Sequence, residues 1–451
     1  MSNERSGFSS RLGFVLATAG SAVGLGNIWR FPYLAAKYGG GTFLLTYLIL
    51  TLTFGFSLMI TEVALGRKAG TSAIRAFGHF SKKYTFIGYL TTIIPFIIFP
   101  YYCVIGGWVT KYALVSIQGG IHNAASDTFF TGFISKSAEP MICVLVFLIA
   151  TTVVVAGGVK GGVERVSTIM MPVLIVLLIG VSLFCITRPG AMAGVAYYLK
   201  PNLKGFSPTT ILAALGQLFY SMSLAMGIMI TFGSYMPKKA DLEKSVTQVE
   251  IFDTGVAFLA GLMIVPAVFV FSNGDSSMLA KGPSLMFVML PKVFDSMAFS
   301  SVIAAVFFIL VLLAALTSSI SLLETLVAVL MDKFHMKRGT ACITMFIIAL
   351  LLAVPSSLGF GAWSNITILG FDFLDFFDFI SNSVLMPIAA FLTCLFVGYI
   401  IKPKVIVDEV ESSGEFKRKP LFLIMVKYIA PICIVAILVF SVLEGLGFIT
   451  V

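Results

Sequence analysis

Two short stretches decide the fold of this chain: GSAVGLGN at residues 20–27 and SMSLAMG at residues 221–227. Each interrupts an apolar segment that is long enough to cross a membrane. Backbone left unpaired at the depth of the hydrocarbon is tolerated only where it lines a cavity or contacts a ligand. We therefore expect both interruptions to face a binding cavity.

The composition places nearly the whole chain in lipid. Of its 451 residues, 58% are hydrophobic and 11% are charged, and the mean hydropathy is +1.02. A soluble domain carries about 25% charged residues. The apolar segments contain no nucleophile–base pair and no HExxH-type metal motif, which argues against a membrane-embedded protease. The six cysteines show no CxxC spacing and are predicted to be small core residues.

Eleven apolar runs reach spanning length, which is about 20 residues. They lie at 12–36, 42–66, 86–116, 139–158, 166–186, 210–235, 247–272, 298–331, 340–356, 377–401 and 421–448. With the N-terminus in the cytoplasm, most Lys and Arg residues fall in inner loops, as the positive-inside rule requires. The sequence thus predicts a multi-pass protein of the cell (inner, cytoplasmic) membrane with its C-terminus outside. Residues 402–419 are expected to form a solvated cytoplasmic loop.

The two interruptions occupy corresponding places in two halves of the chain. Spans 1–5 (about 11–186) and 6–10 (about 205–401) are odd in number, so the second half must enter the membrane from the opposite side. We predict an all-α polytopic fold with a single transmembrane transporter domain over 1–451. It is a 5+5 inverted-repeat bundle with discontinuous helices 1 and 6, plus one additional C-terminal helix at about 421–448. Paired interruptions of this kind mark the binding site of secondary transporters.

Ionisable side chains within spans cost about 2.5–3.5 kcal/mol each on insertion scales and are candidates for function. Arg30 lies one turn outward of the first interruption, and the nearest outer acids are Asp375 and Asp378. An ion pair of Arg30 with Asp378 would close a lid over the interrupted helices, or would simply hold two helices together. The remaining ionisable groups within spans are Glu62, Asp253 and Glu324.

On the eighth span, Ala314, Thr317 and Ser318 stand at i, i+3 and i+4 and share one face. Two hydroxyls beside a carbonyl offer hard oxygen ligands without a net charge, which suits a monovalent cation. By themselves, such residues are more typical of packing between membrane helices than of an ion site. Together with carbonyls freed by the first interruption, they predict a sodium site.

Several motifs resemble the neurotransmitter:sodium symporter family, in particular its bacterial eleven-helix amino acid:sodium symporters. They are RLG at 11–13, GN at 26–27, WRFP at 29–32, GGG at 39–41, EVALGR at 62–67, GQLFYS at 216–221, LTSSI at 316–320 and DFFDF at 375–379. The resemblance covers spans 1–10 in order. It implies a sodium-coupled symporter, not an enzyme, that imports amino acids by alternating access. The alternatives are an amino-acid sensor and a sodium-independent or proton-coupled carrier on the same scaffold.

The resemblance also implies two sodium sites and a substrate site. The first sodium site would use the Ala22 carbonyl, the substrate carboxylate and the side chains of Asn27, Ser221 and Asp253. The second would use the carbonyls of Gly20, Val23 and Ala314 and the hydroxyls of Thr317 and Ser318. The substrate carboxylate would meet the amides of Leu25 and Gly26 and the Tyr102 hydroxyl. The substrate ammonium would face carbonyls near Ala22 and Tyr220. The side-chain pocket would be lined by Ser21, Ile98, Tyr220, Ser223, Met226, Ser318 and Leu322, and Ser221 would belong to the substrate site as well as to the first sodium site.

This pocket is uncharged, so the resemblance implies a neutral, hydrophobic L-amino acid as cargo. Met226 replaces the Phe of several relatives, and flexible methionine would let the pocket take aromatic side chains as well. At the seventh span, Asp253 replaces a common Asn, and Ala257 replaces the Ser of chloride-dependent members. We therefore expect transport without chloride, even though Tyr47, Gln217 and Ser221 match the other chloride-site positions. Proton return through Asp253 is compatible with this expectation.

The resemblance further implies an inner gate and supporting residues. Arg5 and Asp332 match the inner gate pair, with Phe8 where the family usually has Trp. Glu62 would accept hydrogen bonds from the unwound backbone of helix 6, Glu324 would be a second such brace, and Gln217 would support the site. Gly162 and Pro172 match a spacing linked to unwinding of helix 5. The expected partners are a small-molecule substrate and the lipid bilayer, with no nucleic acid and no obligate protein partner.

Overall fold

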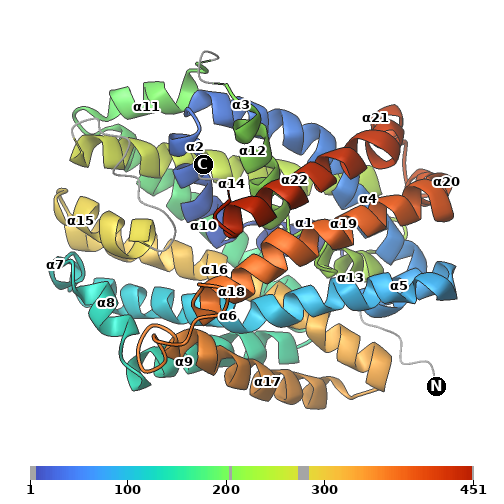
Figure 1. The fold of residues 1–451 in the computed structure, drawn as a ribbon, viewed down its shortest axis with the longest axis horizontal. Coiled ribbons are helices and arrows are strands. Elements are labelled where there is room, and N and C mark those ends of the chain that lie inside the picture. The colour runs from blue at the N-terminus through green and yellow to red at the C-terminus, as the bar shows by residue number, and fades with distance from the viewer. Residues whose placement is uncertain (1–6, 203–205, 273–283, 449–451) are drawn as a thin grey trace.

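The computed structural model describes residues 7–202, 206–272 and 284–448. The described chain is helical, and its long helices cross the molecule side by side in Figure 1. Within the described ranges, nine of these helices are long and apolar enough to cross a membrane. One further pair of helices, joined at a bend, is long and apolar enough when its two parts are counted as one span. The predicted fold class is confirmed.

The first interruption is a sharp bend in the first span. Helix α1 (Arg11–Ala22) ends at the break, and the chain resumes as the wide-turn helix η1 (Gly26–Arg30) and α2 (Phe31–Lys37). The two parts are bent by 55°. Local unwinding of this kind frees backbone carbonyls and amides that a continuous helix would pair.

The second interruption separates α12 (Pro208–Ser221) from α13 (Ile228–Tyr235). Between them, Ser223, Ala225 and Gly227 all have positive φ angles, of 52°, 61° and 74°. No helix continues through residues in the left-handed region, and positive φ is unusual for Ser and Ala. Because α12 and α13 are short, neither is long enough to cross a membrane by itself. The count of eleven spans therefore stays a prediction.

The other predicted spans are present with shifted ends. They are α3 (Gly41–Leu50), η2 (Thr51–Gly55) and α4 (Phe56–Ala69) as one run, α6 (Thr85–Ile117), α9 (Ala138–Ala156), η4 (Val159–Glu164) with α10 (Arg165–Ile186), α14 (Leu242–Phe271), α16 (Ser300–Phe334), α17 (Arg338–Leu358), α18 (Phe373–Asp378) through η8 (Phe379–Leu385), α19 (Met386–Leu395) and η9 (Phe396–Ile400), and α21 (Lys419–Ile424), η10 (Met425–Ile429) and α22 (Ala430–Gly445). The short helices between them are α5 (Ala73–Phe80), η3 (Lys82–Tyr84), α7 (Ile121–Ala124), α8 (Phe129–Ile134), α11 (Ala191–Leu199), η7 (Leu285–Met289), α15 (Leu290–Asp295) and α20 (Lys404–Glu411).

Gly162 and Pro172 both lie in helical turns here. All six cysteines are free and five are buried, as predicted for core residues.

The expectation of a solvated loop at 402–419 is wrong. This segment contains α20, which packs against α4 through a buried ion pair. Arg67 at the end of α4 donates from Nε to Glu409 at 2.8 Å and from Nη1 to the Ala240 carbonyl at 2.9 Å. A buried charge is stable only when it is paired and hydrogen-bonded, and hydropathy alone does not distinguish such a pair from two solvated charges.

Candidate functional site

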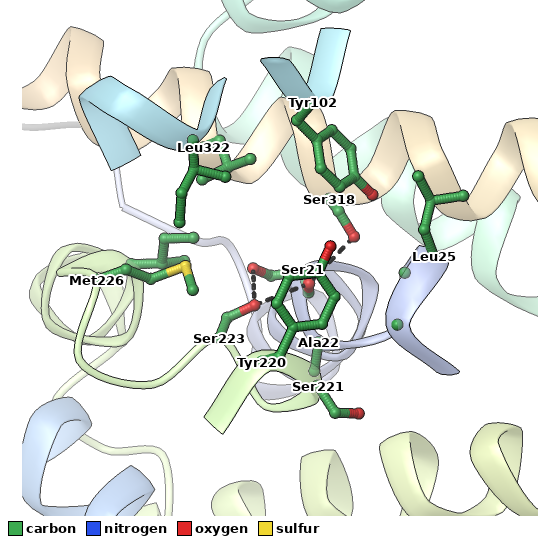
Figure 2. Close-up of a pocket in the computed structure, with 14 residues that line it drawn as sticks. Ser21, Ala22, Leu25, Tyr102, Tyr220, Ser221, Ser223, Met226, Ser318 and Leu322 are labelled. Atoms are coloured by element: carbon green, nitrogen blue, oxygen red, sulfur yellow. Dashed lines mark hydrogen bonds between the residues drawn. The ribbon is translucent and has the colours of Figure 1, made fainter. Parts of the chain in front are cut away.

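A cavity lies between the two interruptions, α6 and α16 (Figure 2). Every residue that the sequence analysis assigned to the substrate lines it: Ser21, Ala22, Leu25, Gly26, Ile98, Tyr102, Tyr220, Ser221, Ser223, Met226, Ser318 and Leu322. Two further lining residues were missed, Gly24 and Ile228. Gly24 belongs to the first quoted stretch and Ile228 directly follows the second, so their position in the sequence was a usable signal.

One end of the cavity presents polar groups. The Tyr102 hydroxyl lies near the Leu25 amide and the Ser318 hydroxyl. Its contacts with these two groups fall short of normal hydrogen-bond geometry, and it forms no hydrogen bond of normal geometry within the described part of the chain, although it is buried. Buried polar atoms are almost always paired in proteins, so an orphaned one that lines a cavity indicates a ligand partner.

The opposite end is apolar. Figure 2 shows Met226 and Leu322 on the side of the cavity away from Tyr102 and Leu25. Ile98 and Ile228 also contribute to the lining. None of the described residues that line the cavity carries a charge, and its remaining polar side chains are hydroxyls.

The two interruptions are joined by serines at the cavity wall. The Ser223 hydroxyl donates to the Ser21 carbonyl at 3.0 Å, and the Ser21 hydroxyl contacts that of Ser223 at 3.3 Å. Figure 2 shows both contacts as dashed lines. Residues 202 positions apart thus hold the unwound segments of the two halves together.

Two glycines bring the first interruption close to neighbouring side chains. A Cβ atom on Gly24 would lie 2.6 Å from the Ser318 hydroxyl oxygen. A Cβ atom on Gly26 would lie 2.5 Å from Cδ1 of the Tyr220 ring. Both distances are far below a normal contact, so only glycine fits at these positions without movement of the cavity wall.

A fully buried carboxylate lies behind the cavity. Asp253 of α14 accepts hydrogen bonds at Oδ1 from the Asn27 amide group at 2.7 Å and from the Ser221 hydroxyl at 2.9 Å. The Tyr47 hydroxyl donates to its other oxygen at 3.3 Å. The structure therefore brings together the three side chains predicted for the first sodium site, and Ala22 lies in the adjacent cavity wall.

The oxygen atoms predicted for the second sodium site also converge. The Ser318 hydroxyl lies 3.5 Å from the Gly20 carbonyl and 3.3 Å from the Val23 carbonyl. The Thr317 hydroxyl lies 3.0 Å from the Ala314 carbonyl. These five residues come from α1, its C-cap and α16. The groups are neutral oxygens without a carboxylate, a set that fits a monovalent rather than a divalent ion.

The predicted supporting residues differ in outcome. Glu62 accepts from the Ala225 amide at 2.7 Å, so it braces the unwound second interruption as predicted. Gln217 donates to the Gly26 carbonyl at 2.9 Å. The prediction for Glu324 needs correction, because this carboxylate accepts from the side chains of Tyr235, at 2.9 Å, and Arg338. Glu324 therefore connects α16 to α13 and α17. These contacts lie beyond the unwound backbone.

A second, larger cavity contains the predicted outer gate residues. Arg30 and Asp378 both line it, but no ion pair joins these two described residues. Arg30 lies over the Tyr220 ring at 5.3 Å, and Asp378 accepts from Tyr101 at 3.1 Å. The closed Arg30–Asp378 pair is therefore not formed in this structure. Tyr38 also lines this cavity, and burial raises the pKa of its hydroxyl to about 12.

The predicted inner gate is seen in part. Arg5 lies outside the described residues, so the Arg5–Asp332 pair stays a prediction. Asp332 accepts from both the amide and the hydroxyl of Ser72. Phe8 is buried, and its amide donates to the Tyr235 carbonyl at 3.0 Å.

Comparisons with known proteins agree with this geometry. The family model described as the sodium:neurotransmitter symporter family matches residues 5–131 and 128–446. An uncharacterised sodium-dependent transporter of Bacillus subtilis is 35% identical over 95% of this chain and 96% of its own. The human sodium- and chloride-dependent GABA transporter 2 is 25% identical over 98% of this chain and 80% of its own. The crystal structure of MhsT in complex with L-phenylalanine superposes with a TM-score of 0.87 and 39% identity, over 97% of this chain and 100% of that one.

Proposed function

The chain belongs to the sodium:neurotransmitter symporter family, and from this premise we propose that it imports neutral, hydrophobic L-amino acids, aromatic ones included, without a need for chloride. The protein is a multi-pass membrane protein and a sodium-coupled transporter of amino acids. In the proposed orientation the N-terminus lies in the cytoplasm and the C-terminus outside. The molecule acts as one transport domain over residues 1–451.

The orphaned Tyr102 hydroxyl is the observation that carries the proposal. An α-amino acid would place its carboxylate between this hydroxyl and the amides of Leu25 and Gly26, at the start of η1, because the positive end of a half-helix attracts anions. Its ammonium would face the carbonyls near Ala22 and Tyr220. Its side chain would extend toward the apolar end, where Met226 can adapt to an aromatic ring.

Two sodium ions would travel with the substrate. The first would bind among the Ala22 carbonyl and the side chains of Asn27, Ser221 and Asp253, and the substrate carboxylate would complete its shell. The second would bind the oxygens that converge between α1 and α16, contributed by Gly20, Val23, Ala314, Thr317 and Ser318. Two charges moved across 100 mV supply about 4.6 kcal/mol, which supports roughly a thousandfold accumulation.

Asp253 would make chloride unnecessary. Two sodium ions need negative charge nearby, and Asp253 is a fully buried carboxylate at the first ion set. Chloride appears in the name of the human relative, whereas this chain carries Ala257 at the position where chloride-dependent members have Ser. A proton on Asp253 during the return step would neutralise the same site.

The gates would close in turn around the loaded cavity. Arg30 would leave the Tyr220 ring and pair with Asp378 to close the outer side. The pair of Arg5 with Asp332 would then separate, which would open the inner side. Both Arg30 and Asp378 already line the second cavity, which supports this pairing.

Uptake of labelled phenylalanine into proteoliposomes tests the proposed ion requirements. We expect uptake to fall to background when external sodium is replaced by potassium, because the ion sets need a small monovalent cation. We expect no change when chloride is replaced by gluconate. Uptake that ignores the sodium swap would favour a proton-coupled carrier, and binding without uptake would favour a sensor. A large loss in gluconate would contradict the role given to Asp253.

The substrate class is tested by competition on the same vesicles. Unlabelled phenylalanine, tryptophan and leucine should each displace the label, whereas glycine, which leaves the apolar end unfilled, should displace it poorly. Burial of each side-chain CH2 group contributes about 0.8 kcal/mol. Equal competition by glycine would contradict the proposed use of the apolar end.

Removal of the Tyr102 hydroxyl should separate binding from stability. Y102F is expected to weaken phenylalanine binding about tenfold or more, because a hydrogen bond to a charged carboxylate contributes about 1.5–3 kcal/mol. The apparent Tm without substrate should change little, since this hydroxyl makes no hydrogen bond of normal geometry within the described part of the chain. Scintillation proximity binding and thermal unfolding in detergent measure the two effects, with Y428F, at an exposed tyrosine, as the control. Unchanged affinity would place the carboxylate elsewhere.

A further inference from the structure

One carboxylate holds the first residues of the first span to a distant helix. Ser9 donates twice to Glu164, from its amide to Oε2 at 2.8 Å and from its hydroxyl to Oε1 at 2.5 Å. The next residue, Ser10, instead caps its own helix by accepting from the Gly13 amide at 2.9 Å. Ser9 and Glu164 are 155 positions apart. Their contact is therefore a clip between α1 and the end of η4.

Glu164 is buried against bare backbone. Its side chain lies so close to α1 that a Cβ atom on Gly13 would be 1.8 Å from Oε1. No ion pair involves Glu164 within the described ranges, and the residue is only 6% exposed. An unpaired buried carboxylate is costly unless it is hydrogen-bonded. Ser9 supplies those bonds while the clip is closed, and water would supply them once Ser9 moves away, so the contact is reversible.

The clip lies at the end of the contact between α1 and α10. Near the C-terminal end of α1, a Cβ atom on Gly20 would meet Met171 of α10 at 3.4 Å and Thr317 of α16 at 3.2 Å. Gly20 and Thr317 belong to the proposed second sodium set. The α1–α10 contact thus runs from that set to Glu164. Separation of these two helices would open a water path from the ion to the surface at Ser9.

We propose that Glu164 is a positioning residue that keeps the inner end of the α1–α10 contact closed, and that its release from Ser9 precedes sodium release toward the cytoplasm. This inference rests on the proposed function and orientation. It adds to the Arg5–Asp332 gate a second closure that involves a different helix. Its failure would leave sodium-coupled transport by this chain untouched.

The test measures access of water to the α1–α10 contact. Ala17 lies four residues after Gly13 and three before Gly20, so the three residues share one face of α1. Ala17 is 1% exposed. An A17C variant in proteoliposomes is treated in sodium with a membrane-impermeant, cationic thiol reagent from the N-terminal side, and the parent chain gives the background of its own cysteines. We expect E164Q to raise the rate of modification of the A17C thiol about tenfold. S9A should raise it less, and not further in the E164Q background.

The matched control is E243Q. Glu243 is likewise buried. It accepts from the backbone amides of Lys417 at 2.7 Å and Arg418 at 3.0 Å, and it forms an ion pair with the Arg418 side chain at 3.7 Å. Because those residues belong to the segment after α20 and not to α1, E243Q should leave the rate unchanged. Glu164 and Glu243 are thus both buried, hydrogen-bonded glutamates, and they differ in the element that they hold and in the ion pair that only Glu243 forms among the described residues.

Two outcomes would overturn the inference: equal rates in the parent and E164Q chains, or equal increases in E164Q and E243Q. If E164Q does not fold, G13A serves as the second variant, since its methyl group displaces the same carboxylate and should raise the rate in the same way. Sodium-dependent phenylalanine binding on the same vesicles separates the hypotheses. A parent chain without such binding contradicts the proposed function, whereas binding with unchanged labelling contradicts only the role of Glu164.

Discussion

Replacement of Asp253 by asparagine should weaken sodium-dependent phenylalanine binding about 100-fold. Asp253 is fully buried and accepts hydrogen bonds from Asn27, Ser221 and Tyr47. In D253N the charge disappears, and an NH2 group confronts donors that previously faced an oxygen. Each hydrogen bond to a charged group contributes about 1.5–3 kcal/mol, and loss of about 2.8 kcal/mol corresponds to 100-fold in affinity.

A sodium titration of phenylalanine binding in chloride-free buffer measures this loss. D408N is the control, because Asp408 is an exposed aspartate on α20 and lies outside the proposed ion set. D408N should bind like the parent chain. A D253N chain with the parent's sodium affinity would remove Asp253 from the first ion site and, with it, the argument for transport without chloride.

Addition of one methyl group at Gly26 should strongly weaken substrate binding. The Cβ atom of G26A would lie 2.5 Å from Cδ1 and 2.7 Å from Cε1 of Tyr220. Tyr220 lines the cavity and carries Arg30 over its ring, so its displacement would distort both the cavity and the outer gate. Overpacking of this kind costs about 1–3 kcal/mol, and the Gly26 amide also belongs to the proposed carboxylate site. We expect a loss of about 100-fold or more in phenylalanine affinity.

G255A is the control for the added methyl group. Gly255 lies in the membrane helix α14, and a Cβ atom there would meet nothing within 4 Å. In a helix interior, alanine is more favourable than glycine by about 1 kcal/mol, so G255A should fold and bind at least as well as the parent. Equilibrium binding and size-exclusion elution check both variants. Parent-like binding by G26A would show that the Tyr220 side of the cavity moves freely, which contradicts a preformed site.

The sequence by itself determined where the chain crosses the membrane and where those crossings break. Hydropathy is a local property, and so is the tendency of GSAVGLGN to leave the helix, because both depend on neighbouring residues. The cavity lining was predicted through the family resemblance, and all twelve residues assigned to the substrate meet around one cavity. Their spacing alone indicated only a break and a set of hydroxyls.

Only the tertiary structure decided which distant side chains pair. Arg30 lies over Tyr220 and not against Asp378, Glu324 holds other side chains, and a segment expected in solvent is held by Arg67. Such contacts join residues far apart in the chain, and their geometry depends on how whole helices pack. Charge and periodicity along the sequence describe one element at a time, so they cannot specify its partner across the bundle.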